Sequence, residues 1–172
     1  MNLFAASIAP AGDRLEVVFG SQRLALAQTG PTQAALAPFT GRDVVMGIRP
    51  EDLAPAAKRG EADDAGSCEL VADVDLVEAL GNEQLVHFAI DAENFRAGRT
   101  GQPASDPGSG VASRFAATPE GKGIARVDPR IRVAAGERIV LGLDVERLHF
   151  FDPATGLSLP SEQGARVEVP AL

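Results

Sequence analysis

Hydrophobic and polar positions alternate with period two over short stretches of the chain, and Gly, Pro and Asp separate these stretches. Such alternation is typical of half-buried β-strands, and apolar repeats of helical spacing are few. The clearest pair of stretches is 14–19 and 22–26, with Gly20-Ser21 between them. Because glycine adopts a positive φ without strain, this pair is predicted to form a hairpin. The pattern therefore predicts a mostly β protein.

A third strand is predicted at residues 44–48. Pro50 ends it, because proline has no N–H to donate to a neighbouring strand. Residues 53–66 combine Ala, Pro, Gly and charged residues without a period, so we expect a loop or linker there. Further short strands are predicted toward the C-terminus, the last of them a frayed edge strand, at residues 124–127, 131–133, 138–143, 149–151 and 166–169.

The stretch 68–77 has the pattern of a strand with one face in water. Val74 and Leu76 fall on one side of it, and Asp73 and Asp75 fall on the other. Successive side chains of a strand point to opposite faces of the sheet. We therefore expect Val74 and Leu76 to be buried together in an antiparallel sheet.

Gly81-Asn82 follows this strand and predicts a turn that needs a positive φ. The segment after the turn, residues 85–90, is apolar on both sides apart from His87. A strand that is apolar on both sides is typical of the middle of a sheet. We therefore expect a central strand here.

About eight short strands with Gly and Pro turns predict an all-β fold, either a small barrel or a sandwich, and OB-like barrels are natural candidates. Residues 92–123 are rich in Gly, Pro, Ser, Ala and Arg, a composition that predicts a long disordered insertion. The predicted organisation is a first set of OB-like strands in 1–53, a linker in 54–66, a second OB-like barrel in 67–153 that contains the insertion, and a C-terminal tail in 154–172.

Acidic residues outnumber basic ones by 24 to 16 in the 172-residue chain, which gives a formal net charge of −8. This charge disfavours a nucleic-acid binder, because binding to phosphates requires basic surfaces. The acidity is uneven, since residues 61–93 hold ten Asp or Glu and no Lys or Arg. Two interpretations of this acidic run stay open: a solvated strand face with its loop, or a docking surface for a basic partner.

No catalytic constellation is present in the sequence. Gly121-Lys122 lacks both the upstream glycine and the following Ser or Thr of a phosphate-binding loop. Cys68 is the only cysteine, which excludes an internal disulfide and a cysteine-rich zinc site. His87 and His149 lie in apolar β segments, and we expect them to be core or edge residues rather than metal ligands. The chain is therefore not expected to be an enzyme.

Four separated segments resemble one family. Residues 45–53, with the sequence VMGIRPEDL, and residues 77–83, with VEALGNE, are similar to two signatures of the C-terminal regulatory region of ATP-binding subunits in bacterial ABC importers. Residues 1–4, MNLF, resemble the opening of that region, and residues 142–152, GLDVERLHFFD, resemble its closing strand pair. The chain is thus similar to the TOBE, or OB-like, domain of importers of the maltose, trehalose and sn-glycerol-3-phosphate type.

This resemblance implies interleaved OB-like β barrels of the TOBE type that are regulatory and mediate dimerisation without being catalytic. The implied partners are a second copy of the chain, the ATPase domain of the parent subunit, the transmembrane permease subunits indirectly, and a regulatory protein, but no nucleic acid. ATP and Mg would bind the ATPase domain, so no cofactor is expected in this chain. No run approaches the roughly 18 apolar residues of a membrane span. The implied location is cytoplasmic, peripheral at the inner face of the plasma membrane.

The resemblance also places the interface or regulatory residues in the two signatures. Arg49 and Glu51 flank Pro50 at a strand end, where their charges can either meet the partner subunit or clamp loops within the chain. Glu83 is expected to contact the partner subunit, and if Phe150-Phe151 is extended only one of its rings points inward. The full candidate set is Gly47, Arg49, Pro50, Glu51, Gly81, Asn82 and Glu83.

Two other functions were compatible with an OB-like barrel. One is a free-standing domain that binds an oxyanion or another small ligand, similar to molybdate-binding relatives. The acidity of the chain and the absence of a basic cluster argue against it. The other is a nucleic-acid module, which the charge and the absence of Trp and Tyr disfavour.

Overall fold

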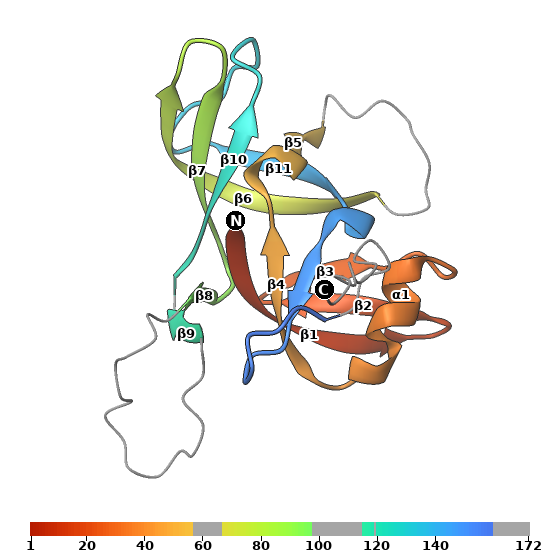
Figure 1. Ribbon diagram of the computed structural model, residues 1–172. Helices are drawn as coiled ribbons and strands as arrows, with labels where there is room; N and C mark the ends of the chain where they lie inside the picture. Colours follow the sequence, from red (N-terminus) through yellow and green to blue (C-terminus); the bar gives the residue numbers. More distant parts are fainter. Residues whose placement is uncertain (57–66, 98–114, 119, 160–172) are drawn as a thin grey trace, which may run out of the picture.

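The computed structural model of the chain describes residues 1–56, 67–97, 115–118 and 120–159. Their strands form two curled sheets in which every pairing of named strands is antiparallel, and one hydrophobic core spans both sheets (Figure 1). In Figure 1 the first sheet lies below, mainly in red and orange, and the second lies above it, in yellow to blue. The prediction of an all-β fold is confirmed.

The first sheet has the strand order β12-β4-β1-β2-β3, in which β8 also pairs with β1 and β9 pairs with β8. Strand β12 pairs with β4, so the C-terminal part of the described chain returns to the sheet in which the chain begins. The strands of this sheet are β1 (Asn2–Ala11), β2 (Arg14–Phe19), β3 (Gln22–Ala25), β4 (Asp43–Ile48), β8 (Asn94–Ala97), β9 (Phe115–Thr118) and β12 (His149–Phe151).

Strand β1 was not predicted from the sequence. Its residues are apolar or small at almost every position, so no period of two is visible in the letters. In the structure the period is strict, with every second residue from Asn2 to Ile8 buried and the residues between them half-buried. The strand forms because β4 and β2 supply its hydrogen-bonding partners from farther along the chain.

The predicted hairpin around Gly20-Ser21 is confirmed by the pairing of β2 with β3. Gly20 has a φ of 54°, in the left-handed region. Its backbone also lies against the carbonyl of Asp91, which a Cβ at Gly20 would overlap at 1.3 Å. Glycine is therefore required at position 20 for two reasons: the positive φ of the turn and the close approach of a second chain segment.

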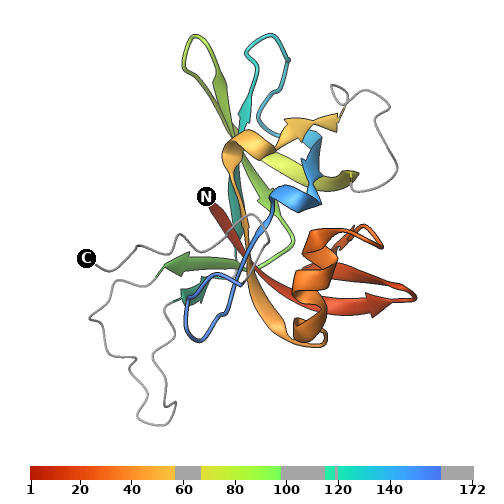
Figure 2. The same ribbon diagram turned by 45° about the vertical axis from the view of Figure 1, so that its right-hand side comes forward.

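The second sheet has the strand order β10-β7-β6-β11-β5, and β7 is a central strand, as predicted. The turn between β6 and β7 and the loop that follows β10 project side by side from this sheet, as the two views in Figures 1 and 2 show. The strands of this sheet are β5 (Ala54–Pro55), β6 (Ser67–Ala79), β7 (Gln84–Ile90), β10 (Gly121–Val127) and β11 (Arg138–Asp144).

Strand β6 departs from the predicted alternation. The register between β6 and β7 shifts between Val74 and Leu76, which is a β-bulge at Asp75. Val74 is 2% exposed, whereas Leu76 is 49% exposed. The expectation that these two side chains share the buried face was therefore wrong, because an extra residue in one strand turns the following side chains to the other face.

The helices among the described residues are short: α1 (Pro31–Leu36), η1 (Ala37–Phe39), η2 (Pro50–Asp52) and η4 (Val145–Arg147). The first of these, α1, was not predicted, and the residue just before it, Gly30, has no side chain that could cap it. Glu146 accepts hydrogen bonds there instead, from the backbone N–H of Thr32 at 3.4 Å and from its hydroxyl at 2.6 Å. None of the helices in this part of the chain has the length and the apolar content that crossing a bilayer requires.

Two predictions about irregular segments were wrong within the described residues. The span 92–123 was expected to lack order, yet it contains β8, β9 and the start of β10. Pairing with β1 and β7 overrides the local composition there. Residues 131–133 were expected to form a strand, but Ile131 instead donates its N–H to the carbonyl of Asp128 in a turn. The predicted edge strand 166–169, residues 98–114 and most of the linker lie outside the described residues, and the domain boundaries stay predictions.

Candidate functional site

Gly47 is buried in β4, between β1 on one side and β12 on the other. A Cβ at this position would lie 3.2 Å from the ring of Phe151 and 3.4 Å from the Cβ of His149, which is tighter than ordinary contact. The Sδ atom of Met1 would be closer still, at 2.6 Å. Gly47 therefore allows three strands to pack closely, which is a structural role.

Arg49, Pro50 and Glu51 follow β4 and lead into η2. The strand ends before Pro50, as predicted, and the N–H of Asp52 donates to the carbonyl of Arg49 at 3.0 Å. The side chains of Arg49 and Glu51 are exposed. Neither of them forms an ion pair or a side-chain hydrogen bond with another described residue. Neither charge is therefore held in an ion pair with another described residue.

A contact between two loops is instead made by the neighbouring residue Asp52. The carboxylate of Asp52, whose side chain is 7% exposed, accepts a hydrogen bond from the guanidinium of Arg147 at 3.0 Å. Arg147 also lies 3.7 Å from the carboxylate of Asp144. This pair joins η2 to η4, which the sequence analysis did not find. Both residues lie in segments that carried the family resemblance, so their opposite charges were the available signal.

Gly81, Asn82 and Glu83 form the turn of the β6–β7 hairpin, as predicted. Gly81 has a φ of 85°, and the N–H of Leu80 donates to the carbonyl of Glu83 at 2.8 Å to close the turn. Gly81 and Asn82 are exposed, whereas Glu83 is half-buried. The carboxylate of Glu83 pairs with the guanidinium of Arg126 on β10.

Arg126 connects the two signatures, although the sequence analysis did not single it out. Its pKa is raised, first by the hydrogen bond to Glu83, then by the charge of that carboxylate, and further by the charge of Glu51. The strand β10 that carries Arg126 also packs against η2. The structure therefore brings Glu51 and Glu83, which are distant in sequence, to the same basic side chain.

Both histidines are half-buried: His87 lies on the central strand β7, and His149 lies on β12 at the edge of the first sheet. His87 lies 2.9 Å from the carboxylate of Glu78 on the neighbouring strand. The Nε2 atom of His149 is buried and has no hydrogen-bond partner among the described residues. Burial lowers the pKa of His149, the positive charge of Arg49 lowers it further, and Asp52 opposes the shift. Within the part of the chain that the structure describes, no group of three or more His, Cys, Asp or Glu could hold a metal ion.

Two family models match the chain, one for the MalK OB fold domain over residues 1–53 and one for the TOBE domain over residues 46–121. By these matches residues 1–53 carry an OB fold domain and residues 46–121 carry a TOBE domain. The resemblance drawn from the four sequence segments is confirmed, and the all-β architecture of two curled sheets agrees with it. The two matches together cover residues 1–121, and neither of them is to a nucleotide-binding domain.

The curated relatives of this OB and TOBE chain are ATP-binding proteins of importers. The chain is 30% identical over 148 residues to the sulfoquinovosyl glycerol transport ATP-binding protein SmoE of Agrobacterium fabrum, covering 86% of this chain and 31% of that protein. It is 28% identical over 159 residues to the trehalose import ATP-binding protein SugC of Mycobacterium tuberculosis, covering 92% and 38%. It is 31% identical over 156 residues to the sn-glycerol-3-phosphate import ATP-binding protein UgpC of Burkholderia lata, covering 91% and 33%. The chain thus spans about a third of the length of these relatives.

Proposed function

We propose that the chain is the regulatory and dimerisation region of an ATP-binding subunit that drives the import of a carbohydrate or a glycerol phosphate. The names of the relatives support this substrate class, since they refer to the transport of sulfoquinovosyl glycerol and to the import of trehalose and sn-glycerol-3-phosphate. In this proposal ATP and Mg bind a nucleotide-binding domain outside the chain. The subunit then works in the cytoplasm, at the inner face of the plasma membrane, against transmembrane permease subunits and under the control of a regulatory protein.

One observation carries the dimerisation proposal. Arg49 and Glu51 are exposed beside each other, have opposite charges, and form no ion pair with other described residues. A twofold dimer is self-complementary, so that a residue i of one copy contacts j of the other and j contacts i. Arg49 of each copy can then pair with Glu51 of the other copy through charge-assisted hydrogen bonds. Each dimer would contain two such pairs.

Sedimentation velocity over a series of protein concentrations tests this arrangement. Arg49→Glu and Glu51→Arg, made singly, place like charges together across the interface, and each is expected to weaken the dimer about tenfold or more. The double variant restores opposite charges and is expected to recover most of the affinity. Arg23→Glu is the matched control, because Arg23 is an exposed arginine on β3 near a carboxylate, at 3.5 Å from Glu16.

A purified chain that stays monomeric at every concentration would contradict dimerisation by this chain alone. A double variant that is no stronger than the single ones would contradict the Arg49–Glu51 pairing. The wider proposal has a separate test, an immunoblot of the source cell with an antibody raised against this chain. A band well above the 17.9 kDa of the chain is expected if it is part of an ATP-binding subunit.

A further inference from the structure

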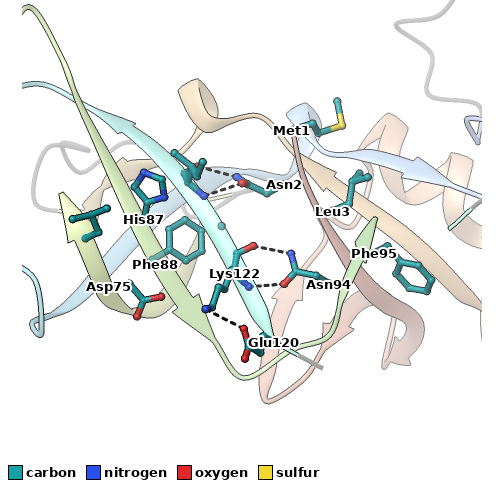
Figure 3. Close-up of a pocket in the computed structure, with 13 residues that line it drawn as sticks. Met1, Asn2, Leu3, Asp75, His87, Phe88, Asn94, Phe95, Glu120 and Lys122 are labelled. Carbon is teal, nitrogen blue, oxygen red and sulfur yellow. Dashed lines mark hydrogen bonds and ion pairs between the residues drawn. The ribbon is translucent and has the colours of Figure 1, made fainter. Parts of the chain in front are cut away.

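A cleft of about 730 Å³ lies where the start of β1 and strand β8 meet the second sheet (Figure 3). Strands β6, β7 and β10 supply the rest of its wall. Its size is in the range of clefts that hold a small molecule or a few side chains of a partner. None of the seven candidate residues of the two sequence signatures lines it.

The backbone edge of β10 beside this cleft is closed. The side-chain amide of Asn2 donates to the carbonyl of Ile124 at 2.9 Å and accepts from its N–H at 2.8 Å. The amide of Asn94 makes the same pair of hydrogen bonds with the backbone of Lys122. Figure 3 shows both amides lying against β10 as a neighbouring strand would. A partner therefore cannot add a strand to this edge and has to bind through side chains.

The cleft exposes apolar surface because of the bulge in β6. The bulge turns Leu76 away from the core and into the cleft, where 49% of the side chain is exposed. Leu3 and Ile124 line the same cleft and are half-buried. Bulges often re-aim a side chain at a functional place, and apolar side chains gathered in a cleft mark a binding surface.

The charges around the cleft are mainly negative. The ammonium of Lys122 lies 3.0 Å from the carboxylate of Glu120, and the charge of Asp75 acts on it as well. All three side chains are exposed, and among the side chains that line the cleft the two carboxylates outnumber the one ammonium. Asp75 forms no ion pair or hydrogen bond with another described residue. The cleft also lies beside the β6–β7 hairpin, which carries no Lys or Arg.

This charge distribution determines which class of molecule the cleft can bind. A second copy that offered the same cleft would bring carboxylates against carboxylates, and a phosphate or a nucleic acid would meet the same repulsion. A cationic side chain is attracted to Asp75 and Glu120, and an apolar side chain beside it covers Leu76 and Ile124. We propose that the cleft is a docking site for a segment of a partner protein that presents a basic side chain next to an apolar one. The site is separate from the proposed dimer contact.

The test uses the full chain and two short synthetic peptides, one built of leucine, alanine and arginine and one with glutamate in place of arginine. Isothermal titration gives the affinities, and amide chemical shifts locate the binding. The arginine peptide is expected to bind and to shift the amides around Leu76, Lys122 and Ile124. Leu76→Ser is expected to weaken binding about fivefold to tenfold, because half of a leucine side chain is no longer buried. Asp75→Asn is expected to weaken it about fivefold.

Two exposed residues of the same strand provide matched controls. Val71, which is 40% exposed and does not line the cleft, is replaced in Val71→Ser, and Glu69 is replaced in Glu69→Gln. Both changes are expected to alter affinity less than about twofold. Far-UV circular dichroism and thermal unfolding establish that each variant is folded.

Four results would overturn the proposal. Equal affinity for the two peptides would mean that the cleft does not select a basic side chain. Equal losses of affinity in Asp75→Asn and Glu69→Gln would mean that the net charge of the chain, and not the cleft, attracts the arginine peptide. No saturable binding of the arginine peptide would remove the site itself. If Leu76→Ser abolished self-association in sedimentation while peptide binding stayed unchanged, the occupant of the cleft would be a second copy.

Discussion

The two asparagines that bind the edge of β10 allow a matched test of how burial decides the value of a hydrogen bond. Asn2 and Asn94 each make two hydrogen bonds to one backbone unit of the same strand. Asn2 is 7% exposed and joins the first sheet to the second, whereas the hydrogen bonds of Asn94 are exposed to solvent. The perturbation is Asn2→Ala, with Asn94→Ala as its control.

Asn2→Ala leaves both the N–H and the carbonyl of Ile124 without a partner in a partly buried place. An orphaned buried polar group costs about 1 to 3 kcal/mol, and the open cleft beside Ile124 lets water reach part of it. We therefore expect Asn2→Ala to lower the free energy of unfolding by about 2 to 3 kcal/mol. In Asn94→Ala water replaces the lost amide, so its cost is expected to stay below about 1 kcal/mol.

Urea unfolding followed by circular dichroism measures both values, and an unchanged m-value establishes that the transitions are comparable. For a chain of this size the loss in Asn2→Ala corresponds to a drop in Tm of roughly 4 to 12 °C. Asn2→Asp serves as a second variant, because it keeps the size and the acceptor but removes the donor. If Asn2→Ala and Asn94→Ala cost the same within about 0.5 kcal/mol, burial does not set the value of these hydrogen bonds and the reasoning is wrong.

Three further predictions can be measured by the same unfolding assay. Gly123→Ala is expected to cost about 1 to 3 kcal/mol, because a Cβ there would lie 2.3 Å from the buried ring of Phe88; a neutral result would mean that the ring can move. The pKa of His149 is lowered by burial and by a neighbouring arginine, so the unfolded chain takes up the proton first as the pH falls. Stability is therefore expected to fall between about pH 8 and about pH 5 by more in the wild type than in His149→Gln, and parallel pH profiles would contradict this. Arg147→Gln leaves the carboxylate of Asp52, 7% exposed, without its cation and is expected to cost about 1 to 2 kcal/mol; a loss no larger than that of an exposed surface pair would show that water reaches this carboxylate.

The turns of the fold were predictable from the sequence because their cause is local. Gly20-Ser21 and Gly81-Asn82 each supply a positive φ between two alternating stretches, and both hairpins form. The strand β1 was not predicted because the residues on both of its faces are apolar or small. Only its pairing with β4 and β2 determines which of these residues are buried and which are half-buried. Leu76 was assigned to the wrong face because a bulge depends on the register between two strands. The sequence of one strand alone does not show it.

The candidate site was predictable only as two motifs. The sequences of these motifs correctly predicted that Arg49 and Glu51 lie at a strand end and that Glu83 lies at a turn. The sequence could not show that Arg126 on β10 stands beside both motifs, because that contact depends on how η2 packs against the second sheet. The intersubunit role of these residues stays a prediction.

The return of β12 to β4 affects how the protein is made. On the ribosome, β1 to β4 are synthesised first, but the outer edge of β4 has no partner until His149–Phe151 has emerged. The whole second sheet is synthesised in between, so the first sheet is completed last by a pairing of large sequence separation. Such pairings form slowly, and an uncovered strand edge can pair with another chain in the meantime. The nascent chain is therefore most exposed to misassembly before β12 is in place.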